Sequence, residues 1–369
     1  MTDLDHLPLL VAWSAFALAV VFGAAANRVN FCTMGAVSDV VAMADWRRMR
    51  MWLLAIAVAI AGANALEATG LVDLGKTIYT SPRIPWVSHL VGGFLFGFGM
   101  TLASGCGSRT LIRLGAGNLK SLVVLMVLGI AAYMTLKGLF AVWRVSTLDI
   151  FRFDTASFGA AHSDLVSVLG AVSGASAIGP WLAFLVAGAV AAFVFASREF
   201  RASPDLIVGG AVIGAVIVGG WYVSGHLGYL AEDPRTLEEA FVATNSGRAE
   251  SFSFVAPVGY LLELLLLWTD QSRIVTFGIA GVLGLAVGSA AMAIATRTFR
   301  WEGFASVEDL VNHIVGGVLM GFGGVTALGC TIGQGLTGIS TLAIGSLIAV
   351  AAIVTGCVAA LKYQYWRAA

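Results

Sequence analysis

Charged residues are scarce in this sequence. Asp, Glu, Lys and Arg make up 11% of its 369 residues, and the formal net charge is zero. The lack of excess positive charge gives no sign of nucleic-acid binding, so we expect no nucleic-acid partner. Hydrophobic residues make up 59% of the chain. A soluble protein of this size could not cover so much apolar surface, which indicates an integral membrane protein.

Cysteines are also few, and the four that occur form no CxxC pair. This counts against a membrane thiol oxidoreductase, so an enzyme is not the favoured interpretation. Neither Met nor His adjoins Cys106 or Cys330, which counts against a channel for soft metals. We therefore expect no metal and no cofactor. The first residues, MTDLDHLPLL, lack a basic region and a cleavage site, so we expect a retained span rather than a signal peptide.

Long apolar segments recur along the chain and predict an all-α polytopic membrane protein with a single membrane domain, 1–369. We expect about nine transmembrane helices, at roughly 8–26, 49–67, 86–103, 119–140, 178–197, 205–224, 273–296, 311–328 and 340–361. Shorter apolar segments cannot cross the hydrocarbon and suit re-entrant half-helices. There are four of these, at about 31–44, 106–114, 254–268 and 330–338.

Eighteen residues of the sequence occur twice. The segments 89–106 (HLVGGFLFGFGMTLASGC) and 313–330 (HIVGGVLMGFGGVTALGC) lie 224 residues apart and agree at 11 of 18 positions. The order of spans and short helices also repeats, which gives a first repeat, 1–140, a connecting span, 141–204, and a second repeat, 205–369. Since one odd span separates the copies, we expect inverted repeats; a parallel duplication would need an even linker.

The distribution of Lys and Arg predicts the orientation. One side carries 13 of the 21 basic residues and should be cytoplasmic. These are Arg28, Arg47, Arg48, Arg50, Arg109, Arg113, Lys120, Arg198, Arg201, Arg297, Arg300, Lys362 and Arg367. The N-terminus is then outside and the C-terminus inside. The loop 225–252, rich in acids, is then external.

Two lone acids occupy the same position of the repeat. Asp39 and Glu263 lie 224 residues apart, each in a short apolar helix. Acids within membranes are functional candidates by default, so both are candidates for proton coupling. The alternative is that each is a packing partner for Arg or for a backbone group.

Three of the four short helices begin at a cysteine: Cys32, Cys106 and Cys330. The third short helix has Ala256 at the matching position. Helix N-termini bind anions, and a thiol suits a soft sulfur or selenium atom better than an oxygen. A cysteine in a membrane helix is otherwise a small apolar filler, which is our interpretation of Cys357. The repeated Gly-Cys position makes the filler role a poor account of Cys106 and Cys330.

Polar residues follow two of the cysteines closely. Arg109 comes three residues after Cys106, and Thr331 and Gln334 follow Cys330. Each either contacts a bound anion or satisfies the backbone where the helix is broken. We count them with the cysteines as candidate substrate-binding residues.

The segments NRVNFCTMGAVSD, SGCGSRTLIRLGAGN and LGCTIGQGLTG resemble the YeeE/YedE family of bacterial inner-membrane proteins. The resemblance implies an hourglass-shaped protein with nine spans and four short helices. It also implies uptake of thiosulfate, whose terminal sulfur passes through S–H···S contacts from Cys330 on the outer side to Cys106 and then Cys32. A small cytoplasmic sulfur carrier of the TusA type is an implied partner.

The alternatives are a membrane persulfide-transfer oxidoreductase that uses the same cysteines covalently, and a transporter of a selenium compound. The sequence departs from the family at two features. Arg109 adds a cation near the central cysteine. The connections 140–177 and 225–252 are long.

Overall fold

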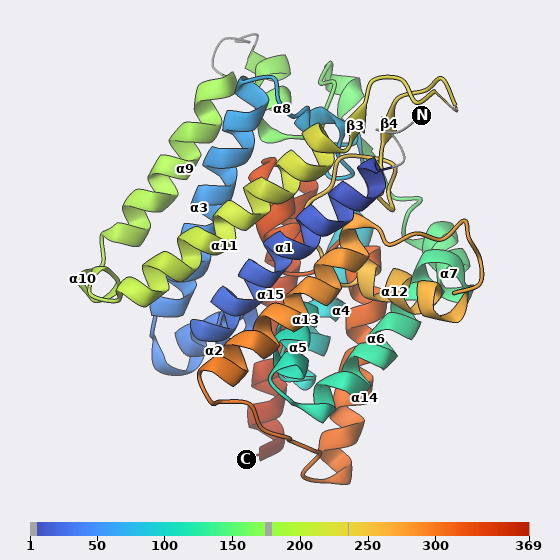
Figure 1. Ribbon diagram of the computed structural model, residues 1–369. Coiled ribbons are helices and arrows are strands. Elements are labelled where there is room, and N and C mark those ends of the chain that lie inside the picture. Colours follow the sequence, from blue (N-terminus) through green and yellow to red (C-terminus); the bar gives the residue numbers. More distant parts are fainter. Residues whose placement is uncertain (1–5, 174–178, 235, 369) are drawn as a thin grey trace.

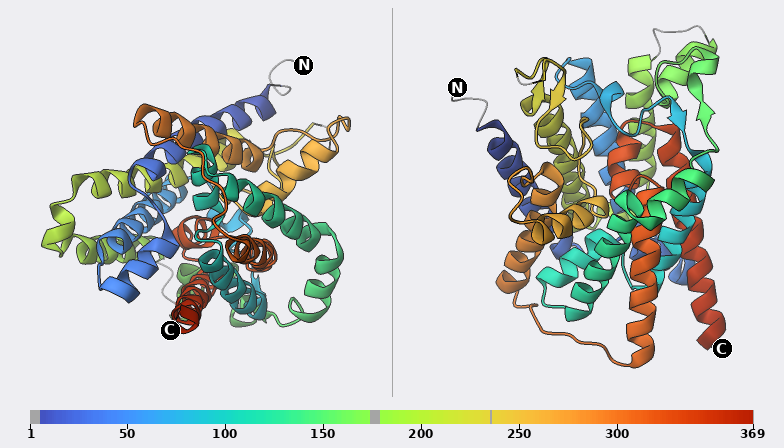
Figure 2. Two further views of the ribbon diagram at one scale, coloured as in Figure 1. Left: turned by 90° about the horizontal axis from the view of Figure 1, so that it is seen from below. Right: turned by 90° about the vertical axis from the view of Figure 1, so that its right-hand side faces the viewer.

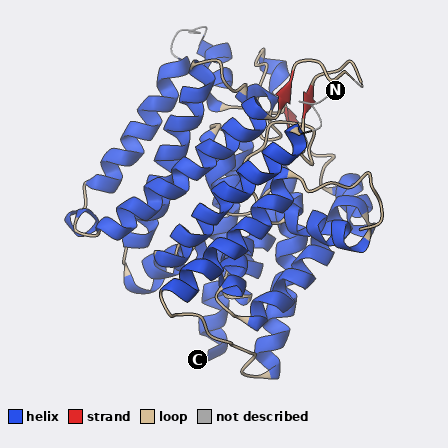
Figure 3. Ribbon diagram, viewed as in Figure 1, coloured by secondary structure: helices blue, strands red, loops and turns tan. Residues whose placement is uncertain are grey.

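The protein is an assembly of helices with very little sheet (Figures 1 and 3). The computed structural model describes residues 6–173, 179–234 and 236–368. Residue 178, the first of the predicted span 178–197, lies outside the described residues, as do the first five residues of the predicted first repeat.

Nine helices in these ranges have 17 or more residues, and they correspond to the nine predicted spans. Seven helical stretches are long and apolar enough to cross a bilayer. The two remaining long helices are α9, which is short and apolar, and α14, which has 20 residues and carries Glu308 and Asp309 in its first turn. The nine are α1 (Leu7–Arg28), α3 (Arg47–Ala68), α4 (Trp86–Leu102), α6 (Leu119–Lys137), α9 (Gly179–Phe195), α11 (Pro204–Tyr222), α13 (Phe277–Ala295), α14 (Val307–Thr326) and α15 (Ile344–Ala368).

The predicted short segments are also helical. They are α2 (Thr33–Met43), α5 (Gly107–Gly115), α12 (Ala256–Leu266) and η5 (Gly333–Gly338). The last differs from the others because it is a π-helical turn, in which the N–H of Thr337 donates to the carbonyl of Ile332 at 2.9 Å. Such π-turns are rare and are frequent at functional sites.

The connections contain small elements that were not predicted. Gly138 ends α6, so the predicted span 119–140 stops at Lys137 and α7 begins. The helical elements that were not predicted are α7 (Leu139–Thr147), α8 (Leu165–Ser173), α10 (Arg198–Arg201) and the short helical turns η1 (Leu74–Lys76), η2 (Thr155–Phe158) and η4 (Val223–Leu227). The strands form two antiparallel pairs, β1 (Arg83–Ile84) with β2 (Phe153–Asp154) and β3 (Tyr229–Leu230) with β4 (Ala240–Phe241).

The long helices form two groups with the short helices between them (Figure 2). Helices α1, α3, α11 and α13 pack together, and α9 covers α3 at the edge. Helices α4, α6, α14 and α15 form the second group. The short helices bridge the groups, since α5 contacts α13 and α6, and α2 contacts α3 and α15.

The helix contacts occur in matched pairs. Helix α1 packs on α13 as α11 packs on α3, and α4 packs on α15 as α14 packs on α6. When each helix is replaced by its counterpart in the other repeat, each contact becomes the other contact of its pair. A two-fold axis relating the repeats would have this effect.

Helices α4 and α14 are counterparts that pack directly against each other. A Cβ on Gly92 would lie 2.8 Å from the carbonyl oxygen of Gly323, and a Cβ on Gly99 would lie 2.8 Å from that of Gly316. Contacts this close need glycine. They also fix the direction, because the lower-numbered glycine of α4 meets the higher-numbered glycine of α14. The two helices are therefore antiparallel.

The described part of the chain begins and ends on opposite faces of the molecule. Helix α1 starts near the face that carries β3 and β4, and α15 ends at the opposite face (Figure 1). An odd number of spans has this consequence.

Candidate functional site

The same backbone turn precedes each of the three cysteines. Residues Asn30, Ser104 and Leu328 have positive φ angles of 52°, 56° and 60°, and each lies two residues before a cysteine. In each case the residue after the one with positive φ donates its backbone N–H to the carbonyl of the residue five positions before it. These hydrogen bonds run from Phe31 to Ala26 (2.9 Å), from Gly105 to Met100 (2.7 Å) and from Gly329 to Gly324 (2.7 Å). This turn ends a long helix and directs the chain at once into a short one.

Each thiol therefore lies at the N-terminal end of a short helical element. The Sγ of Cys32 accepts from the N–H of Gly35 at 3.4 Å, and the Sγ of Cys330 accepts from that of Gly333 at 3.4 Å. The Sγ of Cys106 lies 3.2 Å from the hydroxyl of Ser108. All three cysteines are buried. Ser, Thr, Asp or Asn would cap a helix better, so capping alone does not explain three cysteines.

Cys106 is within electrostatic range of both Cys32 and Cys330. Cys357 differs in kind, because it lies inside α15 and accepts a hydrogen bond at 3.3 Å from the hydroxyl of Thr101.

Two arginines converge on the turn before Cys32. Arg109 donates to the side-chain oxygen of Asn30 at 3.1 Å, and Arg48 donates to the carbonyl of the same residue at 3.1 Å. Arg48 is neutralised by Asp39, with a separation of 3.0 Å. Within the described ranges, Arg109 has no carboxylate at salt-bridge distance, so its positive charge is available to an anion at this end.

Several polar atoms in the residues that follow Cys330 along the chain are unpaired. In the described part of the chain, the buried hydroxyls of Thr331 and Ser346 have no hydrogen-bond partner. Gln334 donates from Nε2 to the carbonyl of Ala327, at the end of α14, and its Oε1 is unpaired. Gln334 thus satisfies broken backbone, one of the two predicted roles. The hydroxyl of Thr33, next to Cys32, is unpaired as well. Unpaired buried hydroxyls are costly unless they bind water or a ligand.

A cavity adjoins each end of the cysteine series. The Cys330-side cavity has a volume of about 330 Å³, reaches Leu328 and Gln334, and is lined by four arginines: Arg83, Arg144, Arg152 and Arg248. The Cys32-side cavity has a volume of about 310 Å³, reaches Asn30, and is lined by Arg28, Arg109, Arg113 and Arg300. Each cavity has one carboxylate, Asp149 and Glu302 respectively. Both therefore attract anions.

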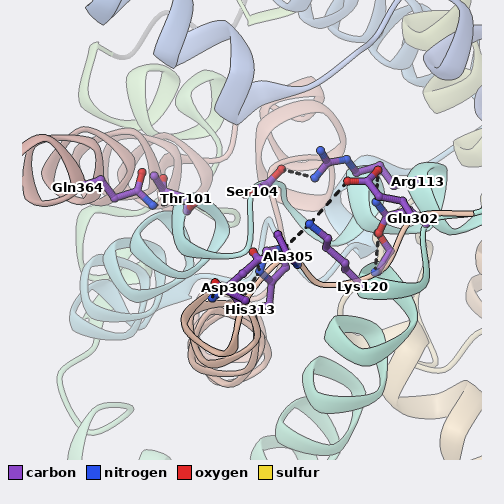
Figure 4. A network of polar contacts seen from close by, with 12 residues as sticks. Thr101, Ser104, Arg113, Lys120, Glu302, Ala305, Asp309, His313 and Gln364 are labelled. Carbon is purple, nitrogen blue, oxygen red and sulfur yellow. Dashed lines mark hydrogen bonds and ion pairs between the residues drawn. The ribbon is translucent and has the colours of Figure 1, made fainter. Parts of the chain in front are cut away.

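A polar network braces the turn that precedes Cys106. Figure 4 shows Arg113 extended toward Ser104, to whose carbonyl it donates at 3.0 Å. Beside it, Lys120 lies 2.9 Å from Asp309 and 3.6 Å from Glu302. These contacts tie the start of α6 to the start of α14 and to the loop before it.

The two predicted proton-coupling residues both have cationic partners. Asp39 pairs with Arg48, and Glu263 lies 3.1 Å from Lys137 and 3.2 Å from Arg273. These are the contacts that the packing alternative predicts. An ion pair between an arginine and this acid thus occurs in both repeats, because Arg273 lies close to the position 224 residues after Arg48.

The sequence alone did not identify the arginines of the Cys330-side cavity. Three of them, Arg144, Arg152 and Arg248, lie in the two long connections 140–177 and 225–252. The unusual length of these connections was the available signal. Nothing in the sequence indicated that both connections fold back to the same cavity.

Comparison with known proteins identifies the family. The family model described as "Sulphur transport" matches residues 28–359. The thiosulfate transporter TsuA of Escherichia coli (strain K12) is 27% identical over 321 residues, which cover 84% of this chain and 82% of that protein. The protein of the same name from Spirochaeta thermophila is 25% identical over 342 residues, 91% of this chain and 94% of that protein. The chain is a multi-pass membrane protein that belongs to the sulphur transport (YeeE/YedE) family.

Proposed function

We propose that this protein imports thiosulfate by passing it along Cys330, Cys106 and Cys32. The observation that carries the proposal is the repeated turn, which brings three buried thiols to the N-terminal ends of three short helical elements. The names of the two relatives favour thiosulfate over other sulfur anions.

The site chemistry matches the two ends of this anion. Thiosulfate has oxygens that carry charge and a terminal sulfur that is soft. Helix N-termini, arginines and the unpaired hydroxyl of Thr331 interact with the oxygens, and the thiols contact the sulfur. A thiol is a weak hydrogen-bond donor. Weak, repeated contacts suit transport, because a substrate that is held too tightly cannot leave.

The antiparallel packing of α4 and α14 supports an inverted repeat. If both helices cross the bilayer, corresponding residues of the repeats face opposite sides. The Cys330-side cavity then opens to the periplasm of a bacterial inner membrane, and the Cys32-side cavity opens to the cytoplasm. The N-terminus is periplasmic and the C-terminus cytoplasmic. The basic residues of α3 and α5 favour this orientation.

Transport in this proposal forms no covalent bond, so the protein is not an enzyme. A TusA-like sulfur carrier at the cytoplasmic face would consume the delivered sulfur and keep the gradient inward. Asp39 and Glu263 remain candidates for proton coupling, although their ion pairs are arranged as helix-packing contacts.

The test is uptake of labelled thiosulfate by cells that lack other uptake routes. Wild type should accumulate label, and Cys106→Ala should not. The matched control is Cys357→Ala, which removes a buried thiol outside the series. Equal uptake by Cys106→Ala and wild type, at equal expression, would show that the thiol relay is wrong. A persulfide trapped on Cys32 during turnover would favour the oxidoreductase alternative.

A further inference from the structure

Glu250 is an acid that the transport path described above does not use. It lies in the connection between η4 and α12 and is partly buried. No Lys, Arg or His lies within salt-bridge distance of it in the described part of the chain, unlike Asp39 and Glu263. Its Oε2 accepts a hydrogen bond from the hydroxyl of Ser246 at 3.0 Å. The backbone N–H groups of Asn245 and Ser246 also face the carboxyl, so hydrogen bonds, but no cation, stabilise its charge.

Glu250 lines a third cavity, which adjoins the arginine-lined entrance. This cavity has a volume of about 150 Å³, and it shares Ile78, Tyr79 and Leu328 with the Cys330-side cavity. It also reaches Gly329, the residue before Cys330. The cavity that Glu250 lines and the entrance therefore share part of a wall.

The backbone gives a second connection to Cys330. The N–H of Phe254 faces the sulfur of Cys330, and Phe254 is four residues after Glu250. Four extended residues span at most about 14 Å. The backbone thus keeps Glu250 near Cys330, so a negative charge on it would repel a dianion bound there.

The groups that face Glu250 do not supply a compensating charge. Tyr79 faces it from the segment after η1, and Tyr260 faces it from α12. The neighbouring Arg248 turns to the other cavity and donates to the carbonyl of Thr77 at 3.1 Å. Lys76, whose carbonyl accepts from the N–H of Ala249, pairs with Glu239.

We infer that Glu250 controls entry of the substrate: the dianion reaches Cys330 when Glu250 is protonated and is repelled when Glu250 is charged. This inference rests on the proposed import of a sulfur dianion. Burial raises the pKa of Glu250 to about 7. The group is thus neutral below this pH and charged above it, so uptake should be fastest in mildly acidic medium and should fall as external pH rises through 7.

The test is uptake of labelled thiosulfate into right-side-out vesicles, with internal pH held constant and the membrane potential clamped. Thiosulfate keeps both charges in this pH range, so the substrate itself does not titrate. The protonated fraction of a group with this pKa falls about tenfold between pH 6 and pH 8, and wild-type uptake should fall by a similar factor. Glu250→Gln should remove the dependence and keep uptake high at pH 8.

Two further variants keep the test decisive. Ser246→Ala removes a hydrogen bond that lowers the pKa of Glu250, so the midpoint should move to higher pH. Glu238→Gln removes an exposed acid of the same loop and should keep the wild-type profile. An unchanged profile in both Glu250→Gln and Ser246→Ala would overturn the inference. Absence of wild-type uptake at every pH would instead overturn the proposed function.

Discussion

The two ends of the cysteine series have the same backbone but different chemistry. Cys32 and Cys330 follow the same left-handed turn. The sulfur of each accepts a hydrogen bond from the backbone N–H of the residue three positions later. The two ends differ in the charge of the groups around the cysteine. Arg48 and Arg109 face the Cys32 end, whereas Cys330 is surrounded by neutral groups such as Thr331 and Tyr79. At the Cys330 end the arginines lie in the cavity rather than beside the turn.

The repeat shows where this difference arises. The residue 224 positions after Arg109 is Gly333, and the residue 224 positions after Cys32 is Ala256. The duplication thus accounts for the equivalent turns before Cys106 and Cys330, whereas Phe254, the counterpart of Asn30, does not have the positive φ angle. The Cys32 end differs from its counterpart in this turn, in its thiol and in the nearby arginine. A symmetric path has no chemical direction. The extra thiol and guanidinium at one end give this path two unlike ends.

The largest effect should come from removing either end thiol. We expect Cys330→Ala and Cys32→Ala each to lower thiosulfate uptake about 100-fold, equivalent to about 2.7 kcal/mol in the barrier. The ends should differ in binding. In right-side-out vesicles on ice, Cys330→Ala should lose binding of labelled thiosulfate, and Cys32→Ala should keep it. Loss of binding in both variants would contradict the assignment of Cys330 to the outer end.

The next effect concerns the framework that the two ends share. A Cβ on Gly323 would lie 2.6 Å from backbone atoms of α4, whereas a Cβ on Gly188 of α9 would meet nothing within 4 Å. Overpacking costs about 1–3 kcal/mol, so Gly323→Ala should lower the unfolding temperature by several degrees. Gly188→Ala is the matched control and should leave it unchanged. A thermal shift assay in detergent measures both, and equal unfolding temperatures would contradict the close packing of α4 and α14.

A smaller effect should follow from removing the unpaired cation at the Cys32 end. Arg109→Gln should lower uptake about tenfold, since hydrogen bonds to charged groups contribute about 1.5–3 kcal/mol. Arg109→Lys should recover part of the loss because it keeps the charge. Lys362→Gln, an exposed cation near the C-terminus, is the control. If Arg109→Gln behaves like Lys362→Gln, the charge difference between the ends has no role in transport.

The smallest effect should come from the rim of the Cys330-side cavity. The side chain of Arg83 is 67% exposed, so its charge is screened by solvent. We expect Arg83→Gln to raise the KM for uptake by about two- to threefold at low ionic strength and to have no effect at high salt. A change that persists at high salt would indicate direct contact with the substrate.

Much of the fold could be predicted because apolar length and the repeat both report it. The nine long helices and the four short elements lie close to their predicted positions. The end of α6 at Gly138 and the π-turn at Gly333–Gly338 were not predicted. Hydropathy averages over a window, so it detects neither a single glycine break nor the choice between helix types.

Less of the candidate site could be predicted. The cysteines were found because two of them occupy the same position of the repeat. The partners of Asp39 and Glu263 lie on other helices, and the arginines of the Cys330-side cavity come from distant loops. Such groups meet only through tertiary packing, which one sequence does not encode in any local pattern. Glu250 was missed for the same reason, because the cavity that it lines with Tyr79 and residues of α12 forms only in the folded protein.

The central claim is that thiols recognise the terminal sulfur of the substrate. Its most direct test is uptake of thiosulfate labelled at that sulfur into proteoliposomes, with excess unlabelled thiosulfate or sulfate as competitor. Sulfate is likewise a tetrahedral dianion but has an oxygen in place of the terminal sulfur. The account predicts that thiosulfate abolishes uptake of label and that sulfate leaves it nearly unchanged. Equal inhibition by the two anions would contradict recognition through Cys330, Cys106 and Cys32.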